Sequence, residues 1–198
     1  MLETINLVGG RLCLDFCNTI RGRDRTEAND FWQRYADLAD WCVHTEILGP
    51  NDADRLKVTA LTDPRAADRA LRAARRLREA MHGAFAAEAS GRGADEGHLE
   101  QINDVLVRGN SRRKLRPAMQ GACWIWDDAP TDLEAVLWPV AWSAGDLLTS
   151  SQLEYVKECD GCPWLFLDAS RNHSRRWCDM RDCGNRHKVR RFRTRSNG

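Results

Sequence analysis

Four cysteines near the end of the chain have the spacing of a metal site. Two residues separate Cys159 from Cys162, four separate Cys178 from Cys183, and 15 residues lie between the two pairs. Each close pair can direct two sulfurs towards one point, and four thiolates complete a tetrahedron around zinc at about 2.3 Å per bond. Because the protein would fill all four positions, the pattern predicts one structural Zn2+ and leaves no position for a catalytic water.

Two other uses of these thiols stay open. His173 or His187 could replace one sulfur in a mixed site, since histidine nitrogen also binds zinc. The first pair has the form CxxC, which also occurs in redox dithiols, although a second pair at metal spacing argues against that use. The other cysteines lack this pattern and are expected to pack as small hydrophobic residues; they are Cys13, Cys17, Cys42 and Cys123.

Positive charge is concentrated in the same segment. From residue 157 onward the chain has 11 Lys and Arg against 5 Asp and Glu, a net charge of +6, whereas residues 1–156 carry −5. Zinc with four thiolates carries a net negative charge of about −2, which leaves about +4 for the metal-loaded segment. Such a segment is expected either to contact an anionic partner or to remain a solvated helix.

The residues after Cys183 are expected to form a helix that begins at the metal. Val189 and Phe192, three residues apart, would pack back on the metal site. The basic side chains would then project, and a phosphate backbone is the anionic partner that such a row suits. The residues predicted to bind nucleic acid are Arg175, Arg176, Arg186, Lys188, Arg190, Arg191 and Arg193.

Helical periodicity dominates the part of the chain that must position this site. The clearest helix starts after Asp63, an expected N-cap, with Pro64 in its first turn. Its apolar stripe consists of Leu71, Ala74, Leu77, Met81 and Phe85. Six arginines around the stripe are expected to form a solvated face: Arg65, Arg69, Arg72, Arg75, Arg76 and Arg78.

Three further helices are predicted within residues 29–48, 99–106 and 131–150. Gly49 and Pro50 should stop the first of them. Thr131 and Glu134 have the pattern of a capping box at the start of the third. Pro139 lies inside the third helix and should kink or break it.

Two short strands are predicted between the second and third of these helices. RKLRPAM and ACWIWDD flank Gln120 and Gly121, and alternation places Trp124 and Trp126 on one side. The predicted fold class is therefore mainly α (α+β). A helical N-terminal domain with a short β-hairpin would cover residues 1–155, and a small treble-clef-like zinc knuckle would cover residues 156–198.

The stretch LCLDFCNT, residues 12–19, places polar side chains among apolar ones. As a strand it would direct Cys13, Asp15 and Cys17 to one face. Asp15 and Asn18 would either satisfy backbone donors or form the floor of a small-molecule pocket. The residues predicted for the pocket are Asp15, Asn18, Trp41 and Trp142.

Several of these motifs resemble a known family. CGNR at Cys183–Arg186, FLD at Phe166–Asp168, RRWC at Arg175–Cys178 and the upstream CxxC resemble, in order and spacing, the CGNR zinc-finger proteins. The stretch LCLDFCNT resembles the start of the helical ABATE domain that precedes this finger in the family. The resemblance covers nearly the whole chain and implies that the four cysteines are zinc ligands, one for one. The family is bacterial and is described as stress-linked transcription regulators.

These features predict a zinc-dependent nucleic-acid-binding transcription regulator whose N-terminal domain senses a small molecule or a partner. DNA is favoured over RNA. Because one finger helix reads only about 3 base pairs, either a homodimer supplies sequence-specific binding or the contact is mainly with phosphates. The alternative is an RNA-binding or protein-interaction finger without sequence-specific DNA binding. No enzyme is expected, because the sequence has no HExxH, P-loop or GxGxxG motif.

The chain is expected to be cytoplasmic and to have no membrane partner. It contains no run of 18 apolar residues. Glu3 and Asp15 lie where a secretion signal would be uniformly apolar, so no such signal is predicted. A reducing compartment would also keep the cysteines available for metal.

Overall fold

The structure is a computed structural model that describes residues 5–23, 28–127 and 132–196, without the side chains of residues 190, 191 and 194–196. Its helices are α1 (Leu12–Cys17), α2 (Tyr35–His44), α3 (Pro50–Thr62), α4 (Pro64–Ala89), α5 (Glu96–Asn110), α6 (Leu137–Leu148) and α7 (Asn185–Ser196). Three antiparallel hairpins pair β1 (Ile20–Arg21) with β2 (Asn29–Asp30), β3 (Arg113–Pro117) with β4 (Ala122–Trp126), and β5 (Val156–Glu158) with β6 (Leu165–Leu167). The chain is mainly α, as predicted, and none of the described helices is long and apolar enough to cross a membrane.

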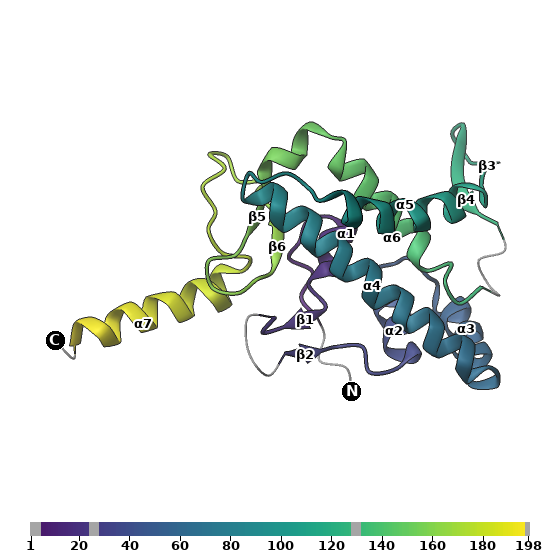
Figure 1. Cartoon of the computed structure of the whole chain (residues 1–198), viewed down its shortest axis with the longest axis horizontal. Helices are drawn as coiled ribbons and strands as arrows, with labels where there is room; N and C mark the ends of the chain where they lie inside the picture. Colours follow the sequence, from purple (N-terminus) through teal and green to yellow (C-terminus); the bar gives the residue numbers. More distant parts are fainter. Residues whose placement is uncertain (1–4, 24–27, 128–131, 197–198) are drawn as a thin grey trace.

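Helix α4 is the scaffold of the body, and the other elements pack around it (Figure 1). It contacts α1, α2, α3, α5, α6 and β5. The Asp63 side chain caps its first turn by accepting a hydrogen bond from the Ala66 N–H at 2.9 Å, and Pro64 is the first helical residue. All five residues of the predicted apolar stripe are buried, so both the cap and the stripe are confirmed.

Helices α5 and α6 correspond to two of the other predicted helices, with different limits. Helix α5 extends beyond the predicted residues 99–106 at both ends. Helix α6 begins at Leu137, after turns over residues 133–136, and Thr131 lies outside the described residues. Pro139 therefore lies in the first turn, where a backbone N–H has no helical acceptor in any case. This position removes the reason for the predicted kink.

The segment predicted as one helix over residues 29–48 contains strand β2 and the shorter helix α2. Helix α2 ends at His44, before the expected stop, and Pro50 opens α3 instead of ending α2. Proline is well suited to this first helical position because its missing N–H is not needed there. Helix α3 escaped prediction because only Ala53 and Leu56 of its side chains are buried, which leaves a weak apolar pattern.

The expected strand at residues 12–17 is wrong, because this segment forms the short helix α1. Five of its six side chains are buried, and it contacts α4, α6 and β6. A segment covered on all sides shows no amphipathic period, so periodicity cannot separate a short buried helix from a strand. In Figure 1, α1 lies at the centre of the molecule.

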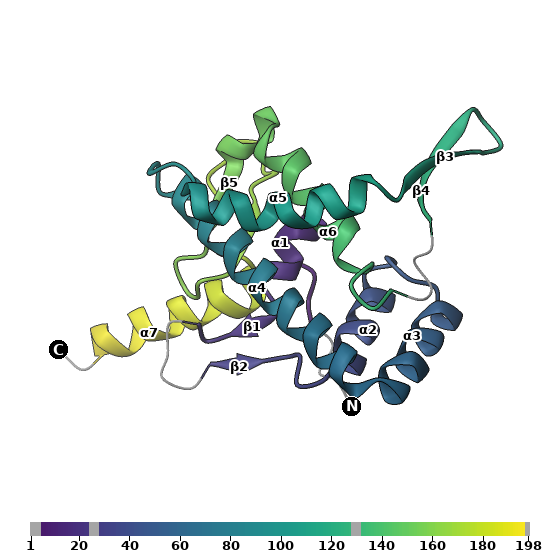
Figure 2. The ribbon, with the colours of Figure 1, turned by 45° about the vertical axis from the view of Figure 1, so that its right-hand side comes forward.

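One of the hairpins projects from the body, and another packs against it. The β3–β4 hairpin consists of the two predicted strands, and it projects from the body (Figure 2). Its register places Leu115 opposite Trp124 and Arg113 opposite Trp126. The β5–β6 hairpin instead lies against the body, and its Val156 and Leu165 are part of the main hydrophobic core. The C-terminal segment thus shares a core with the helices.

One arginine of the predicted solvated face is buried. Arg78 on α4 is only 2% exposed and donates hydrogen bonds to both carboxylate oxygens of Asp30, at 2.9 and 2.7 Å. It also donates to the Thr19 hydroxyl at 3.1 Å, and its guanidinium lies 4.8 Å from the Trp32 ring centroid. Burial alone would raise the pKa of Asp30, but the bonds from Arg78 hold this pKa below its ordinary value. The pair ties the β1–β2 hairpin to α4.

Replacing Asp30 with alanine should strongly destabilise the body, because the buried Arg78 would keep only the half-exposed Glu79 carboxylate, 3.2 Å from its Nε, as an ionic partner. We expect Asp30→Ala to lower the free energy of unfolding by about 3–5 kcal/mol. Asp54→Ala is the matched control, since Asp54 is exposed and pairs with Lys57 at 3.6 Å; its cost should be about 0–1 kcal/mol. Urea denaturation measures both values, and equal losses would show that the buried pair has no special role.

Candidate metal centre

The first cysteine pair lies in the turn between β5 and β6. The Cys159 N–H donates to the Trp164 carbonyl at 2.9 Å, which closes the turn. The Gly161 N–H lies 3.4 Å from the Cys159 sulfur. A Cβ atom on Gly161 would lie 3.1 Å from the Cys183 Cβ and 3.4 Å from its sulfur, so a larger residue would crowd the second pair. Glycine therefore allows the two pairs to approach.

The second pair brackets a turn that leads into α7. Cys178 precedes the turn, and Cys183 lies in a single π-helical turn over Met180–Gly184. The Asp179 side chain accepts a hydrogen bond from the Arg181 N–H at 2.8 Å, and the Gly184 N–H donates to the Asp179 carbonyl at 3.1 Å. These bonds fix the start of α7 relative to the sulfurs.

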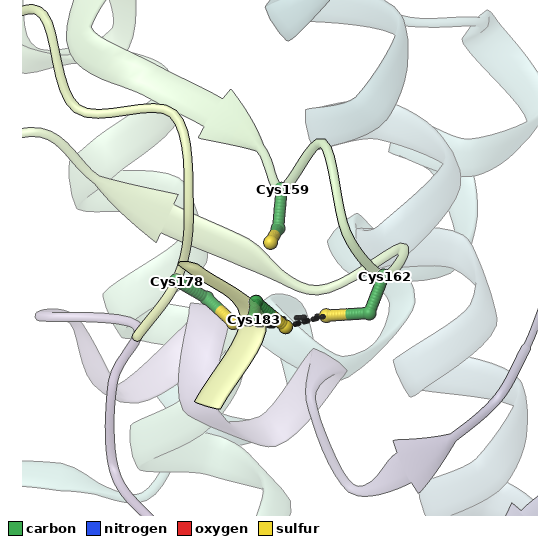
Figure 3. A group of neighbouring side chains, drawn as sticks. All are labelled: Cys159, Cys162, Cys178 and Cys183. Carbon is green, nitrogen blue, oxygen red and sulfur yellow. Dashed lines mark hydrogen bonds between the residues drawn. The ribbon is translucent and has the colours of Figure 1, made fainter. Parts of the chain in front are cut away.

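The four sulfurs converge on one point (Figure 3). Cys162 lies 3.6 Å from Cys178 and 3.6 Å from Cys183, and the Cys178 and Cys183 sulfurs are 3.8 Å apart. A tetrahedron with zinc–sulfur bonds of about 2.3 Å has edges of about 3.8 Å. All four sulfurs lie within 4.8 Å of one another, and none of them is in a disulfide. The residues therefore fit one structural zinc.

Neither histidine belongs to this group. The His173 ring stacks on Tyr155 with centroids 3.8 Å apart, and its Nδ1 lies 2.7 Å from the Asp168 carbonyl oxygen. The His187 ring is exposed and lies 5.5 Å from the Trp177 ring. The mixed-ligand alternative is thus excluded by the positions of both rings.

The thiols of the cluster have pKa values that are shifted in opposite directions. Hydrogen bonding with Cys162 lowers the pKa of Cys159, whereas hydrogen bonding with Cys159 raises the pKa of Cys162 to about 12. Hydrogen bonds with the same two sulfurs raise the pKa of Cys178. A cation that takes four thiolates must displace the remaining protons, so zinc affinity should fall as the pH falls.

Arg186, predicted to bind nucleic acid, also contacts the cysteine cluster. Its Nη2 lies 3.0 Å from the Cys183 sulfur, and its Nε lies 3.1 Å from the Asp182 carboxylate. The hydrogen bond to Cys183 raises the pKa of Arg186. Four thiolates around a divalent cation carry excess negative charge, and a guanidinium at this distance offsets part of it.

An apolar layer supports the cysteines. Phe166 is fully buried, and Trp164 and Trp177 pack against the same cluster. The Arg175 guanidinium lies 4.5 Å from the Phe166 ring centroid, and its Nε donates to the Trp177 carbonyl at 2.8 Å. Arg176 donates to the Asp160 carboxylate at 2.6 Å. Both arginines, predicted to bind nucleic acid, therefore also hold the knuckle together.

Asp168, which sequence reasoning quoted only as part of the FLD motif, organises the loop before Cys178. It is fully buried, and one carboxylate oxygen accepts hydrogen bonds from the Lys157 ammonium at 2.7 Å and the Arg175 N–H at 2.9 Å. The other accepts from the Ser170 N–H at 3.0 Å and its hydroxyl at 2.6 Å. Burial alone would raise the pKa of Asp168, but these donors hold it well below its usual range. The sequence feature that could have indicated this role is the position of an acidic residue directly after an apolar strand.

Asn18 fastens this knuckle to the body. Its side-chain amide donates to the Leu165 carbonyl and accepts from the Leu165 N–H, each at 2.8 Å. The Trp164 indole N–H also donates to the Ile20 carbonyl at 2.7 Å, and the Leu167 N–H donates to the Gly9 carbonyl at 2.8 Å. The segment around α1 therefore holds β6 in place by direct hydrogen bonds.

The other residues predicted for a ligand pocket have separate partners. The Asp15 carboxylate accepts a hydrogen bond from the Gly9 N–H at 2.7 Å. Trp41 packs edge-on against Phe16 and Trp32, with ring centroids 5.3 and 5.8 Å away. Trp142 contacts the Arg113 guanidinium at 3.9 Å. Asp15 and Asn18 thus form hydrogen bonds with backbone groups, which was the first of the two roles predicted for this pair. A ligand site that includes them stays a prediction.

The remaining basic candidates lie on α7. Lys188 and Arg193 are exposed, whereas the side chains of Arg190 and Arg191 lie outside the described part of the structure. Val189 and Phe192 are 48% and 72% exposed, so the prediction that they pack back on the knuckle is wrong. The helix leaves the knuckle after its first turn and projects from the molecule (Figures 1 and 2), while Trp164 and Trp177 already supply the apolar contacts around Phe166.

Comparison with protein families gives two matches. A family model named ABATE, described as "Putative stress-induced transcription regulator", matches residues 10–151. A second model, described as a CGNR zinc finger, matches residues 156–196. No curated protein matches the chain. The predicted division between residues 155 and 156 stays a prediction, since both segments contribute to one hydrophobic core.

The metal site predicts about one equivalent of zinc per chain. Chelation should disorder the segment from Cys159 to the start of α7 and leave most body helices in place, because structural zinc supplies the folding energy of small metal domains. Cys178→Ser should retain less than about half an equivalent. Cys123→Ser is the control, because Cys123 is exposed and outside the cluster. Elemental analysis and far-ultraviolet circular dichroism measure these quantities. Full zinc content in Cys178→Ser, or a disulfide among the four in a reduced sample, would contradict the assignment.

Asp15 predicts an unusual pH dependence. Burial raises the pKa of Asp15 to about 6 from its ordinary 3.8, although hydrogen bonds from the Gly9 and Val8 backbone oppose this shift. The folded state then keeps a proton that the unfolded state loses, so stability from this group is present below pH 4 and is lost as the pH rises through 6.

Asp15→Asn keeps an acceptor oxygen without the charge. Relative to the wild type, its free energy of unfolding should therefore increase by about 1–1.5 kcal/mol between pH 5 and 7. Urea titrations of the zinc-loaded proteins measure this difference. Parallel stability curves over that pH range would refute the buried, partly protonated carboxyl.

Proposed function

The chain belongs to the ABATE family and carries a C-terminal CGNR zinc finger, and we propose that it is a zinc-dependent regulator of transcription that binds nucleic acid through α7. The family description supports the regulatory role. The nucleic-acid contact is supported by the chemistry and placement of the helix that leaves the metal site.

The single observation that carries the proposal is a projecting cationic helix with a fixed origin. From Asn185 to the end, the chain has six Lys and Arg and no Asp or Glu. The π-helical turn fixes the start of α7 at Cys183, one of the four clustered cysteines. A phosphate backbone is the partner that matches a rigid row of cations, since phosphate contacts supply much of the affinity for nucleic acid.

In this proposal the phosphate contacts on α7 include the exposed Lys188 and Arg193. Arg186, also predicted as a contact, donates to the Cys183 sulfur. The helix has 12 residues and is about 18 Å long. That length allows it to contact roughly three to five phosphates.

The body would act as the sensor in this proposal. A small molecule or partner that shifts α1 would act on the knuckle through Asn18, which hydrogen-bonds both backbone groups of Leu165. A homodimer would supply the second contact needed for sequence-specific recognition, since a single finger helix covers about 3 base pairs. The protein would work in the cytoplasm. Its zinc would be structural, because four cysteine sulfurs occupy every position of a tetrahedral site.

Two alternatives give different results in the same measurement. An RNA-binding finger would prefer single-stranded RNA over duplex DNA in competition. A protein-docking finger would lack the steep salt dependence of phosphate contacts. The exposed Val189 and Phe192 are the observation that favours protein docking.

A salt titration of the affinity for a fluorescent duplex tests the proposal. We expect a log–log slope of roughly −3 to −5, and Lys188→Gln with Arg193→Gln should flatten it by about 2, because two phosphate contacts are lost. Zinc-stripped protein should bind more weakly although it keeps every arginine, since the start of the helix is no longer held.

The control is Arg65→Gln with Arg72→Gln, which removes two exposed positive charges from α4. Its slope should equal that of the wild type. Equal slopes for the α7 variant and the control would rule out α7 as the contact. Absence of binding to duplex, single-stranded DNA and RNA at low salt would overturn the proposed function.

A further inference from the structure

The β3–β4 hairpin, residues 112–127, forms an arm that projects from the body at the end opposite α7 (Figures 1 and 2). Several large apolar side chains on it are exposed. Leu115 is 61% exposed, Trp124 is 56% exposed, and Met119 at the turn is fully exposed. An isolated two-stranded hairpin is marginally stable in water, so this arm needs a device that holds its base.

Arg113 holds the base of the arm through contacts with three tryptophan rings. Its guanidinium carbon lies 4.3 Å from the Trp124 ring centroid, 5.6 Å from that of Trp126 and 3.9 Å from that of Trp142. Because these rings belong to β4 and α6, one side chain joins both strands of the arm to the body. Cation–π contacts of this kind contribute about 0.5–1 kcal/mol each at exposed sites.

A glycine completes the attachment. A Cβ atom on Gly109, near the end of α5, would lie 2.9 Å from the Trp138 Cβ and 3.3 Å from the Trp126 ring. Only glycine allows α5 to pass this close to the two rings, whose centroids are 6.0 Å apart. The arm is thus held in a fixed direction, as α7 is by the metal site.

The arm has a basic face and an apolar face. Side chains alternate along a strand, so Lys114 and Arg116 lie on the face opposite Arg113 and Leu115. They stand across from Ile125 and Cys123 in the hairpin register. Lys114 pairs with Asp127, which is the only carboxylate of the arm.

The charge of the arm contrasts with that of the rest of the body. Residues 112–127 contain four Lys and Arg and one Asp, a net charge of +3. Since residues 1–156 together carry −5, the body without the arm carries −8. An acidic body with a cationic element at each end is expected to orient both elements towards an extended polyanion.

We propose that the β3–β4 arm is a second nucleic-acid contact, in which Lys114 and Arg116 bind phosphates of a duplex. This inference rests on the proposed nucleic-acid-binding function and deepens it. A two-stranded ribbon fits the major groove of a duplex, where phosphates on either side come within reach of its basic side chains. A second copy of the acidic body is the competing occupant, and the experiment below separates the two.

The fold sets the spacing of the two contacts. Helix α4 ends beside the knuckle, where Ala86 and Ala89 share a cavity with Lys157 and Arg176. Helix α5 then returns along α4 over 15 residues, about 22 Å, before the arm begins. At about 3.4 Å per base pair, the two contacts need a duplex longer than about 7 base pairs to act together.

The experiment measures salt-dependent affinity of the full, zinc-loaded chain for two DNAs: a duplex of about 24 base pairs and a hairpin oligonucleotide with a stem of about 6 base pairs. The arm variant is Lys114→Gln with Arg116→Gln. These exposed side chains lie outside the Arg113 contacts, whereas Trp124→Ala would loosen the attachment itself. The matched control is again Arg65→Gln with Arg72→Gln, and thermal melting verifies that each variant is folded.

On the long duplex, the slope for the arm variant should be flatter than that of the wild type and the control by about 2. On the short stem, all three should agree within about twofold, because α7 alone suffices there. If the arm variant matches the control on the long duplex, the inference is overturned. If it keeps DNA affinity but shifts the chain from dimer to monomer in sedimentation velocity, the arm is a contact between copies, and the inference is likewise overturned.

The α7 variant separates this inference from the proposed function. If only the arm variant loses affinity, the arm contact stands and the role assigned to α7 is wrong. If only the α7 variant loses affinity, the arm contact is wrong and the proposed function stands. If the wild type binds no nucleic acid at low salt, both are overturned.

Discussion

The convergence of four sulfurs within 4.8 Å is the constraint on which the C-terminal part of the molecule depends. Two turns that are distant in sequence must meet, and a glycine at position 161 leaves the space for them to do so. Few apolar side chains lie beneath the cluster, with Phe166 the only fully buried aromatic ring among them. A segment with so small a core takes much of its folding free energy from the metal. The direction of α7 therefore depends on the binding of zinc by these four sulfurs.

This cluster is not isolated from the helices. Asn18 binds both backbone groups of Leu165, while Val156 and Leu165 belong to the main core. The knuckle and the helical body therefore stabilise one another, and a change at α1 has a direct structural route to the metal site. Coupling of this kind needs two arrangements with different free energies, which a ligand or partner of the body would have to provide.

Positive charge is concentrated in two elements of the molecule, α7 and the arm. The two cationic elements project at opposite ends (Figure 2), and each is fixed at its base by a compact set of contacts. At α7 the set is the cysteine cluster with Arg186, and at the arm it is Arg113 with three tryptophan rings. Arginine is suited to both positions because its planar guanidinium can bind a thiolate or stack on an indole while it keeps its charge.

Sequence alone was sufficient wherever local chemistry decides the structure. The cysteine spacing predicted the metal cluster, because two short turns can each present two sulfurs. Asp63 and Pro64 predicted the start of α4, and alternating tryptophans predicted the arm, since caps and strand registers depend on neighbours in the chain. Tertiary structure decided the features that depend on which groups, distant in the sequence, surround a residue. It made residues 12–17 a helix, because burial on every side removes the periodic pattern. It buried Arg78 beside Asp30, bound Arg186 to a sulfur and left Val189 and Phe192 exposed. A sequence pattern identifies which residues carry charge, but the positions of their partners are set by the packing of the whole chain.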